Sequence, residues 1–307
     1  MLSTSNLKET VNLKWVVTVA CITASLVWID KASPTAGLWL LVLLTATVGF
    51  IHGALDVQLM RQRFSGMFVS GVVGLGYLAA VLLLAWLLSN HVDLALWLLL
   101  LMSAWHFGEP YARWDGLPFN AQVLTRYVVG GAPIMLPVLI FPANLGLLLQ
   151  PALSAQTLAM WTWLANGWLV LLLLWVLFYG LRSLYVTRYA WVDLIGVLIL
   201  NIFFSPVMAF AVYFGLYHAP VHIWRVRRSQ PAQAKMNRLS VAIIFVMTLM
   251  LSIILWQWLG LKFVASSEAG HAVRWLIVVL TALTLPHLVL VSLCSLMLSG
   301  ERRNRIN

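Results

Sequence analysis

The chain has 307 residues, of which 62% are hydrophobic and only 9% are charged, and its mean hydropathy is +0.94. Soluble domains carry roughly 25% charged residues, and disordered chains combine low hydrophobicity with high charge, so both classes are excluded. The two cysteines lie in apolar runs and form no CxxC pair, which excludes disulfide frameworks, zinc ribbons and thiolate-held clusters. The composition therefore predicts a polytopic membrane protein.

The apolar runs predict about eight to ten transmembrane helices, because a helix needs about 20 apolar residues to cross the hydrocarbon core. In chain order, the runs cover residues 15–29, 37–60, 67–88, 93–108, 127–149, 157–180, 190–204, 207–224, 239–260 and 275–298. No linker or internal repeat divides them. We therefore expect one all-α integral membrane domain over residues 1–307. Its helical bundle spans 15–298, between a cytoplasmic tail at 1–14 and a basic cytoplasmic tail at 299–307.

The segment 190–224 can form one long helix or two short ones, because Ser205-Pro206 interrupts it and proline removes a backbone donor. Two crossings there give ten in all. Of the 19 lysines and arginines, sixteen then lie on the side of both termini, and only Lys31, Lys262 and Arg274 lie on the other. Basic residues accumulate on the cytoplasmic side of membranes. We therefore expect a multi-pass protein of the inner (plasma) membrane with cytoplasmic termini. The net charge of +10 then reflects topology and not nucleic-acid binding.

Five of the seven histidines lie in or at the ends of the spans, where ionisable groups are costly and usually functional. They are His52, His106, His218, His222 and His287. The topology rests on lysine and arginine alone, yet it places all five at a similar depth in the cytoplasmic half. We therefore expect one polyhistidine metal site built from four helices. His91 and His271 belong to outer turns and are expected at the surface.

His218 and His222 are four residues apart, so both rings project from one helix face, with Pro220 between them. Ligation by imidazoles alone suits zinc, copper, nickel or iron, and the spacing does not separate these metals. The plainer interpretation of any single buried histidine is an interhelical hydrogen bond.

Two carboxylates accompany the histidines. Asp56 follows His52 by four residues, and Glu109 follows His106 by three. A carboxylate one turn from a histidine commonly orients a ligating ring. We therefore expect Asp56 to orient His52. The alternative interpretations are an ion pair of Asp56 with a nearby arginine and an interfacial position for Glu109.

Aromatic side chains surround the same positions. The candidates to line a pocket for a long, planar, apolar substrate are Trp105, Phe107, Phe214 and Tyr217. Membrane interfaces are rich in aromatic residues, and a chain with 16 tryptophans also places many of them toward lipid.

Four short motifs occur in order along the chain: His52-Gly53-x-x-Asp56, Trp105-His106-Phe107-Gly108-Glu109, His218-x-x-x-His222 and Pro286-His287-Leu288. This set resembles the Brp/Blh family of membrane β-carotene 15,15′-dioxygenases, which are associated with microbial rhodopsins. The resemblance covers about residues 37–298. It implies an iron-dependent enzyme that cleaves the central double bond of β-carotene with dioxygen and gives two all-trans retinal molecules.

The resemblance also implies a site. Its Fe(2+) ligands are His52, His106, His218 and His222, and the residues expected around them are Asp56, Glu109 and His287. The implied partners are β-carotene and O2 as substrates, the lipid bilayer around them, and a retinal-accepting rhodopsin.

Other classes of membrane protein remain open. A metal-dependent oxygenase such as a di-iron hydroxylase or desaturase, acting on lipid or carotenoid, usually carries HxxHH boxes, and none occurs here. A proton or metal-ion transporter would use Asp56 and the histidines as a relay, and usually has inverted repeats. A haem protein with two histidine ligands is a further class. A rhodopsin is disfavoured because no lysine lies in the middle of a span.

Overall fold

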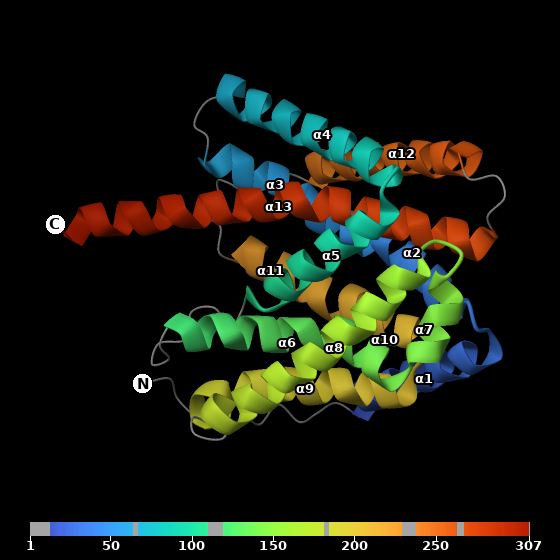
Figure 1. Ribbon diagram of the computed structural model, residues 1–307. Helices are drawn as coiled ribbons and strands as arrows, with labels where there is room; N and C mark the ends of the chain where they lie inside the picture. Colours follow the sequence, from blue (N-terminus) through green and yellow to red (C-terminus); the bar gives the residue numbers. More distant parts are fainter. Residues whose placement is uncertain are drawn as a thin grey trace.

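The computed structural model describes residues 13–63, 67–109, 119–180, 184–228, 238–262 and 267–306. In these ranges the chain is helical almost throughout and contains no β-strand, which confirms the all-α class (Figure 1). Most of the expected N-terminal tail lies outside the described residues, as do some side chains within the helices, including that of His52.

The helices α1 to α13 are joined by three π-helical turns, η2, η4 and η5. In chain order they are α1 (Leu13–Ala32), α2 (Ala36–Leu44), η2 (Thr45–Gly49), α3 (Phe50–Arg63), α4 (Met67–Ser89), α5 (Val92–Phe107), α6 (Phe119–Ile140), α7 (Pro142–Leu149), α8 (Ala155–Trp175), η4 (Val176–Gly180), α9 (Leu184–Phe203), α10 (Pro206–Val212), η5 (Tyr213–His218), α11 (Ala219–Arg228), α12 (Arg238–Lys262) and α13 (Glu268–Ile306).

Six of the described helical segments are long and apolar enough to cross a membrane, so this is a multi-pass membrane protein. They are Gly71–Ser89, Asn120–Ile140, Ala155–Tyr179, Pro206–Trp224, Val241–Lys262 and Glu268–Leu290. Three shorter apolar segments lie among them: Ala36–Gly49, Val92–Phe107 and Ala190–Phe203.

Two boundaries differ from the sequence expectation. The apolar run 127–149 does not form one helix, because α6 ends at Ile140 and α7 begins at Pro142. Phe141 between them leaves the helical conformation, with φ −131° and ψ 53°, and proline suits the first turn of a new helix. At the other end of the chain, α13 continues through the expected basic tail to Ile306.

The segment 190–224 forms two helices, which answers the question left open by its sequence. Chain direction changes at Ser205, before α10 starts at Pro206. The carboxylate of Asp30 in α1 accepts two hydrogen bonds from Ser205, one from the backbone N–H and one from Oγ, both at 2.6 Å. The N–H and the hydroxyl of Ser205, at the start of this helix, are therefore satisfied within the protein, as an apolar environment requires.

Helix α13 lies in the middle of the bundle. It packs against α4 and α12 on one side and against α5 on the other, and α6, α8 and α9 form the far layer (Figure 1). The apolar windows of α6 and α13 are each 61% buried, whereas those of α4 and α12 are 11% and 6% buried. Helices α4 and α12 are therefore the peripheral, lipid-facing members.

The C-terminal ends of α3, α11 and α13 lie at the same end of the bundle, at the left of Figure 1. These ends carry Arg61, Arg63, Arg225, Arg227, Arg228, Arg302, Arg303 and Arg305. Apart from Arg274 near the start of α13, the basic residues of these helices thus lie at one end of the bundle, as the positive-inside rule expects.

Two glycines allow α5 and α6 to approach closely. A Cβ atom on Gly108 would lie 2.0 Å from the carbonyl oxygen of Arg126, and one on Gly130 would lie 2.0 Å from that of Ala104. The guanidinium Nε of Arg126 donates across the same contact to the carbonyl oxygen of Trp105 at 2.7 Å. This contact holds the end of α5, where His106 lies.

We expect Gly130→Ala to destabilise the protein by about 1–3 kcal/mol or more, because the new methyl group meets backbone atoms that cannot move alone. The measurement is the thermal unfolding temperature in detergent. Gly167→Ala in α8 is the matched control, because a Cβ there meets nothing within 4 Å. The control should be neutral or slightly stabilising, since alanine favours helix over glycine by up to about 1 kcal/mol. Equal unfolding temperatures in the two variants would contradict the role of this contact.

Candidate metal centre

Four imidazole rings gather at one place in the bundle, from segments far apart in the sequence. His106 comes from α5, His218 from η5, His222 from α11 and His287 from α13. The ring centre of His106 lies 5.1 Å from those of His218 and His287 and 5.4 Å from that of His222. The rings of His222 and His287 are 5.6 Å apart. Four of the five histidines singled out by sequence thus form one cluster, here called the histidine cluster.

His218 and His222 lie at the junction of the π-helical turn η5 with α11. His218 ends η5, and its ring centre lies 6.2 Å from that of His222. Single π turns are frequent at functional sites, because the extra residue changes where side chains point. Gly215 lets η5 pack closely on α2, since a Cβ there would lie 2.6 Å from Cδ1 of Leu44. The turn is therefore held against the neighbouring helix rather than left at the surface.

Asp56 holds His287, and not through a contact within its own helix. One carboxylate oxygen lies 2.6 Å from Nδ1 of His287, and the other accepts a hydrogen bond of 2.6 Å from the hydroxyl of Tyr77. Asp56 is only 1% exposed. These contacts of the carboxylate join helices α3, α4 and α13. The side chain of His52 lies outside the described residues, so the expectation that Asp56 orients it stays a prediction.

Tyr77 is the residue that sequence reasoning missed. Its hydroxyl is the second partner of the buried Asp56 carboxylate. The available signal was that Tyr77 is the only tyrosine in α4 and stands in a run of aliphatic residues. A phenol in such a run must find a partner inside the protein.

Glu109 contacts His106 only loosely. Its carboxylate lies 4.0 Å from Nδ1 of His106, which is too long for a hydrogen bond, and the side chain is 36% exposed. Glu109 does not hold His106 in the way that Asp56 holds His287.

A small cavity of about 60 Å³ opens beside the cluster, and we call it the histidine cavity. His106, His218 and His287 form part of its wall. Phe107 and Phe214 line it as well, which is where the sequence expectation placed these two candidates. The remaining lining is apolar or glycine except for the hydroxyl side chains Thr45, Ser103 and Thr284, so this space suits a small nonpolar molecule or part of a larger one.

Trp105 and Tyr217 lie outside the lining of the histidine cavity. The ring of Trp105 packs under the guanidinium group of Arg126, at 3.6 Å from the ring centre. Tyr217 is 43% exposed and donates a hydrogen bond of 2.8 Å to Asp193 of the neighbouring helix α9. Trp105 therefore joins α5 to α6, and Tyr217 joins η5 to α9.

His271 is buried, with 8% exposure, although the sequence expectation put it at the surface. Its ring packs edge-on against Trp256 of α12, at 4.2 Å between centres. The first turn of α13 is covered by α12, which residue order alone does not reveal. His91 is exposed as expected.

Imidazole nitrogen, the donor of the histidine cluster, is a donor that transition metals bind. In the part of the chain that the structure describes, no group of three or more His, Cys, Asp or Glu side chains is placed so that it could hold a metal ion. The side chain of His52, an expected ligand, is outside that part. Imidazole nitrogen binds metals at about 2 Å, so rings around one ion have centres about 4.5–6.5 Å apart. The observed spacing of 5.1–6.2 Å lies in this range.

Comparison with known proteins identifies the family. No curated protein and no solved structure matches this chain. The sequence model of the family described as beta-carotene 15,15′-dioxygenase matches residues 42–295, which include all five span histidines and Asp56. A match over most of the chain, with the histidine cluster inside it, leads to one conclusion: the chain belongs to the beta-carotene 15,15′-dioxygenase family.

Proposed function

We propose that this chain cleaves the central 15,15′ double bond of β-carotene with O2 and gives two all-trans retinal molecules. The observation that carries the proposal is the histidine cluster beside an apolar cavity, in a membrane chain of this family. The reaction balances without a reductant, because the two oxygen atoms of one O2 become the two aldehyde oxygens.

We propose Fe(2+) as the cofactor, held by His52, His106, His218 and His222. Bound ferrous iron would supply the electron chemistry by which O2 reacts with a double bond, which protein side chains lack. The support is chemical: imidazole is a ligand that suits iron, and three of the four rings lie in the cluster.

We propose that His287, the fourth ring of the histidine cluster, acts with this set. A proton on Nδ1 of His287, donated to the Asp56 carboxylate, would leave Nε2 as the nitrogen that can bind a metal. A carboxylate held in this way fixes the tautomer and the direction of a ligating ring. Tyr77 fixes the carboxylate in turn. We propose that these three residues position one imidazole of the site.

The apolar wall has its own role. Phe107 and Phe214 can contact the polyene by dispersion and exclude water from the reacting bond. Because β-carotene dissolves in the bilayer, it can reach the site without crossing water. Retinal can leave the same way, toward a rhodopsin in the same membrane.

We propose the cytoplasmic side for the basic helix ends, which puts both termini there and the protein in the inner (plasma) membrane. The support is the grouping of arginines at one end of α3, α11 and α13 (Figure 1).

Replacement of His218 or His222 by alanine should abolish retinal formation while the protein stays in the membrane, because each variant removes an imidazole from the cluster. The measurement is retinal and residual β-carotene, by chromatography, in a bacterial host that produces β-carotene. His91→Ala is the matched control, since His91 is exposed and away from the cluster. Turnover retained in either cluster variant would overturn the ligand assignment.

Asp56→Asn should lower both iron content and cleavage rate by about 10–100-fold, the usual cost of losing a group that orients a metal ligand. The amide keeps the shape of the side chain but loses its charge, so a purely space-filling role predicts no change. Tyr77→Phe should give a smaller loss, because the carboxylate keeps its bond to His287. Iron per chain and retinal per minute are measured on the same purified samples.

Removal of the metal from the purified protein with a chelator should abolish cleavage. Ferrous iron should restore it and zinc should not, because zinc has no redox chemistry. Activity that survives chelation, or that zinc restores, would contradict the iron proposal.

A further inference from the structure

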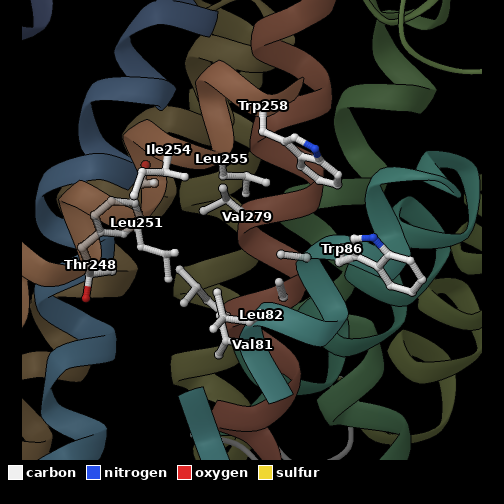
Figure 2. A pocket seen from close by; sticks show the side chains of 14 residues that line it. Val81, Leu82, Trp86, Thr248, Leu251, Ile254, Leu255, Trp258 and Val279 are labelled. Carbon is white, nitrogen blue, oxygen red and sulfur yellow. The ribbon is translucent and has the colours of Figure 1, made fainter. Parts of the chain in front are cut away.

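A second, larger cavity lies between the two peripheral helices. It has a volume of about 270 Å³, and we call it the portal cavity. Figure 2 shows Val81, Leu82 and Trp86 of α4 on one side and Leu251, Ile254, Leu255 and Trp258 of α12 on the other. Val279 of α13 lies between the two groups (Figure 2). The lining is almost wholly apolar, so the portal cavity suits a hydrocarbon.

The portal cavity is open toward the lipid. Leu82, Trp86 and Ile254 line it and are 44%, 58% and 63% exposed. Helices α4 and α12 both pack on α13, but few residues join them directly. A hydrocarbon in the bilayer therefore meets a gap between two helices rather than a sealed wall.

At its inner end the portal cavity reaches the site. Phe50 and Leu283 line both the portal cavity and the histidine cavity, so these two side chains form the partition between them. Leu283 lies one turn before His287 on α13. The portal cavity thus extends from the lipid-facing surface to this partition, on whose other side the histidine cavity lies.

A third apolar cavity, of about 120 Å³, adjoins the histidine cavity elsewhere. The residues that line both are Leu99, Ser103, Phe210 and Leu280. None of them lines the portal cavity. The histidine cavity therefore has an apolar cavity on each of two sides.

We propose that the portal cavity is one arm of the substrate site and receives one half of a carotenoid from the bilayer through the gap between α4 and α12. The other half occupies the third cavity. The inference rests on the proposed function and adds where the two halves of the substrate lie. β-Carotene has no polar group by which a protein could hold it, so the apolar walls of the two arms must hold it.

The test shortens the portal arm with Ala85→Trp, because Ala85 lines the portal cavity. Cleavage of β-carotene should fall by about tenfold or more. Cleavage of a truncated apocarotenal with one β-ionone ring, which gives one retinal and one shorter dialdehyde, should fall far less, since its short end fits the shortened arm. Ala79→Trp is the matched control, because Ala79 is exposed on the same helix and does not line the cavity. It should cleave both substrates like the unchanged chain.

A second pair of variants, Leu82→Trp and Leu83→Trp, tests the lipid-facing opening of the portal cavity. It keeps the proposal testable if Ala85→Trp does not fold. Leu82→Trp should slow β-carotene cleavage, whereas Leu83→Trp, one residue on and outside the lining, should not. Unchanged β-carotene cleavage in both lining variants overturns the proposal. So does an equal loss on both substrates with normal iron content, which points to a lipid acyl chain in the portal cavity.

Binding without turnover separates this inference from the proposed function. After chelation, β-carotene retained per purified chain is measured by visible absorption. We expect the unchanged chain and Ala79→Trp to retain it and Ala85→Trp to lose most of it. If the unchanged chain cleaves no β-carotene, the proposed function fails, and the retention measurement still decides the arm. Equal retention of β-carotene by Ala85→Trp and Ala79→Trp overturns the arm assignment.

Discussion

The fold depends on one constraint: an ionisable side chain inside a membrane must find its partners within the protein, because no water reaches it. Asp56 meets this constraint with His287 and Tyr77, at 2.6 Å each. The contact joins α3, α4 and α13, which are also three of the four helices that form the portal cavity. One polar contact therefore both ties the central helix to its neighbours and orients an imidazole in the cluster.

Apolar packing of high precision surrounds this contact. Gly108 and Gly130 bring α5 and α6 together until backbone meets backbone, which fixes the end of α5 and with it His106 at the centre of the cluster. Helices α4 and α12 are packed far less tightly, and the largest of the three cavities lies between them. In a carotenoid-cleaving family this difference in packing has a physical reason. The imidazole rings must be held in fixed positions for the reaction, whereas a rigid hydrocarbon needs an opening through which it can enter from the lipid.

Sequence reasoning missed contacts between distant helices. The four-residue spacing of His52 and Asp56 predicts a contact within one helix and gives no sign of His287, a partner of Asp56 that lies 231 residues away. Spacing rules describe neighbours on one helix and carry no information about the helix opposite. The same limit explains why Tyr77 was missed and why His271, in an apparent outer turn, is buried against Trp256.

The sequence by itself determined the membrane class, the positions of most helices, the break at Ser205-Pro206 and the set of histidines that gather in the cluster. These depend on hydropathy, proline and charge, which are properties of each residue and its near neighbours. Only the tertiary structure decided which face of each helix points inward. It put Phe107 and Phe214 at the cavity, Trp105 and Tyr217 away from it, and Asp56 against His287. Helix rotation is set by side-chain packing between segments distant in the chain, and no local pattern encodes it.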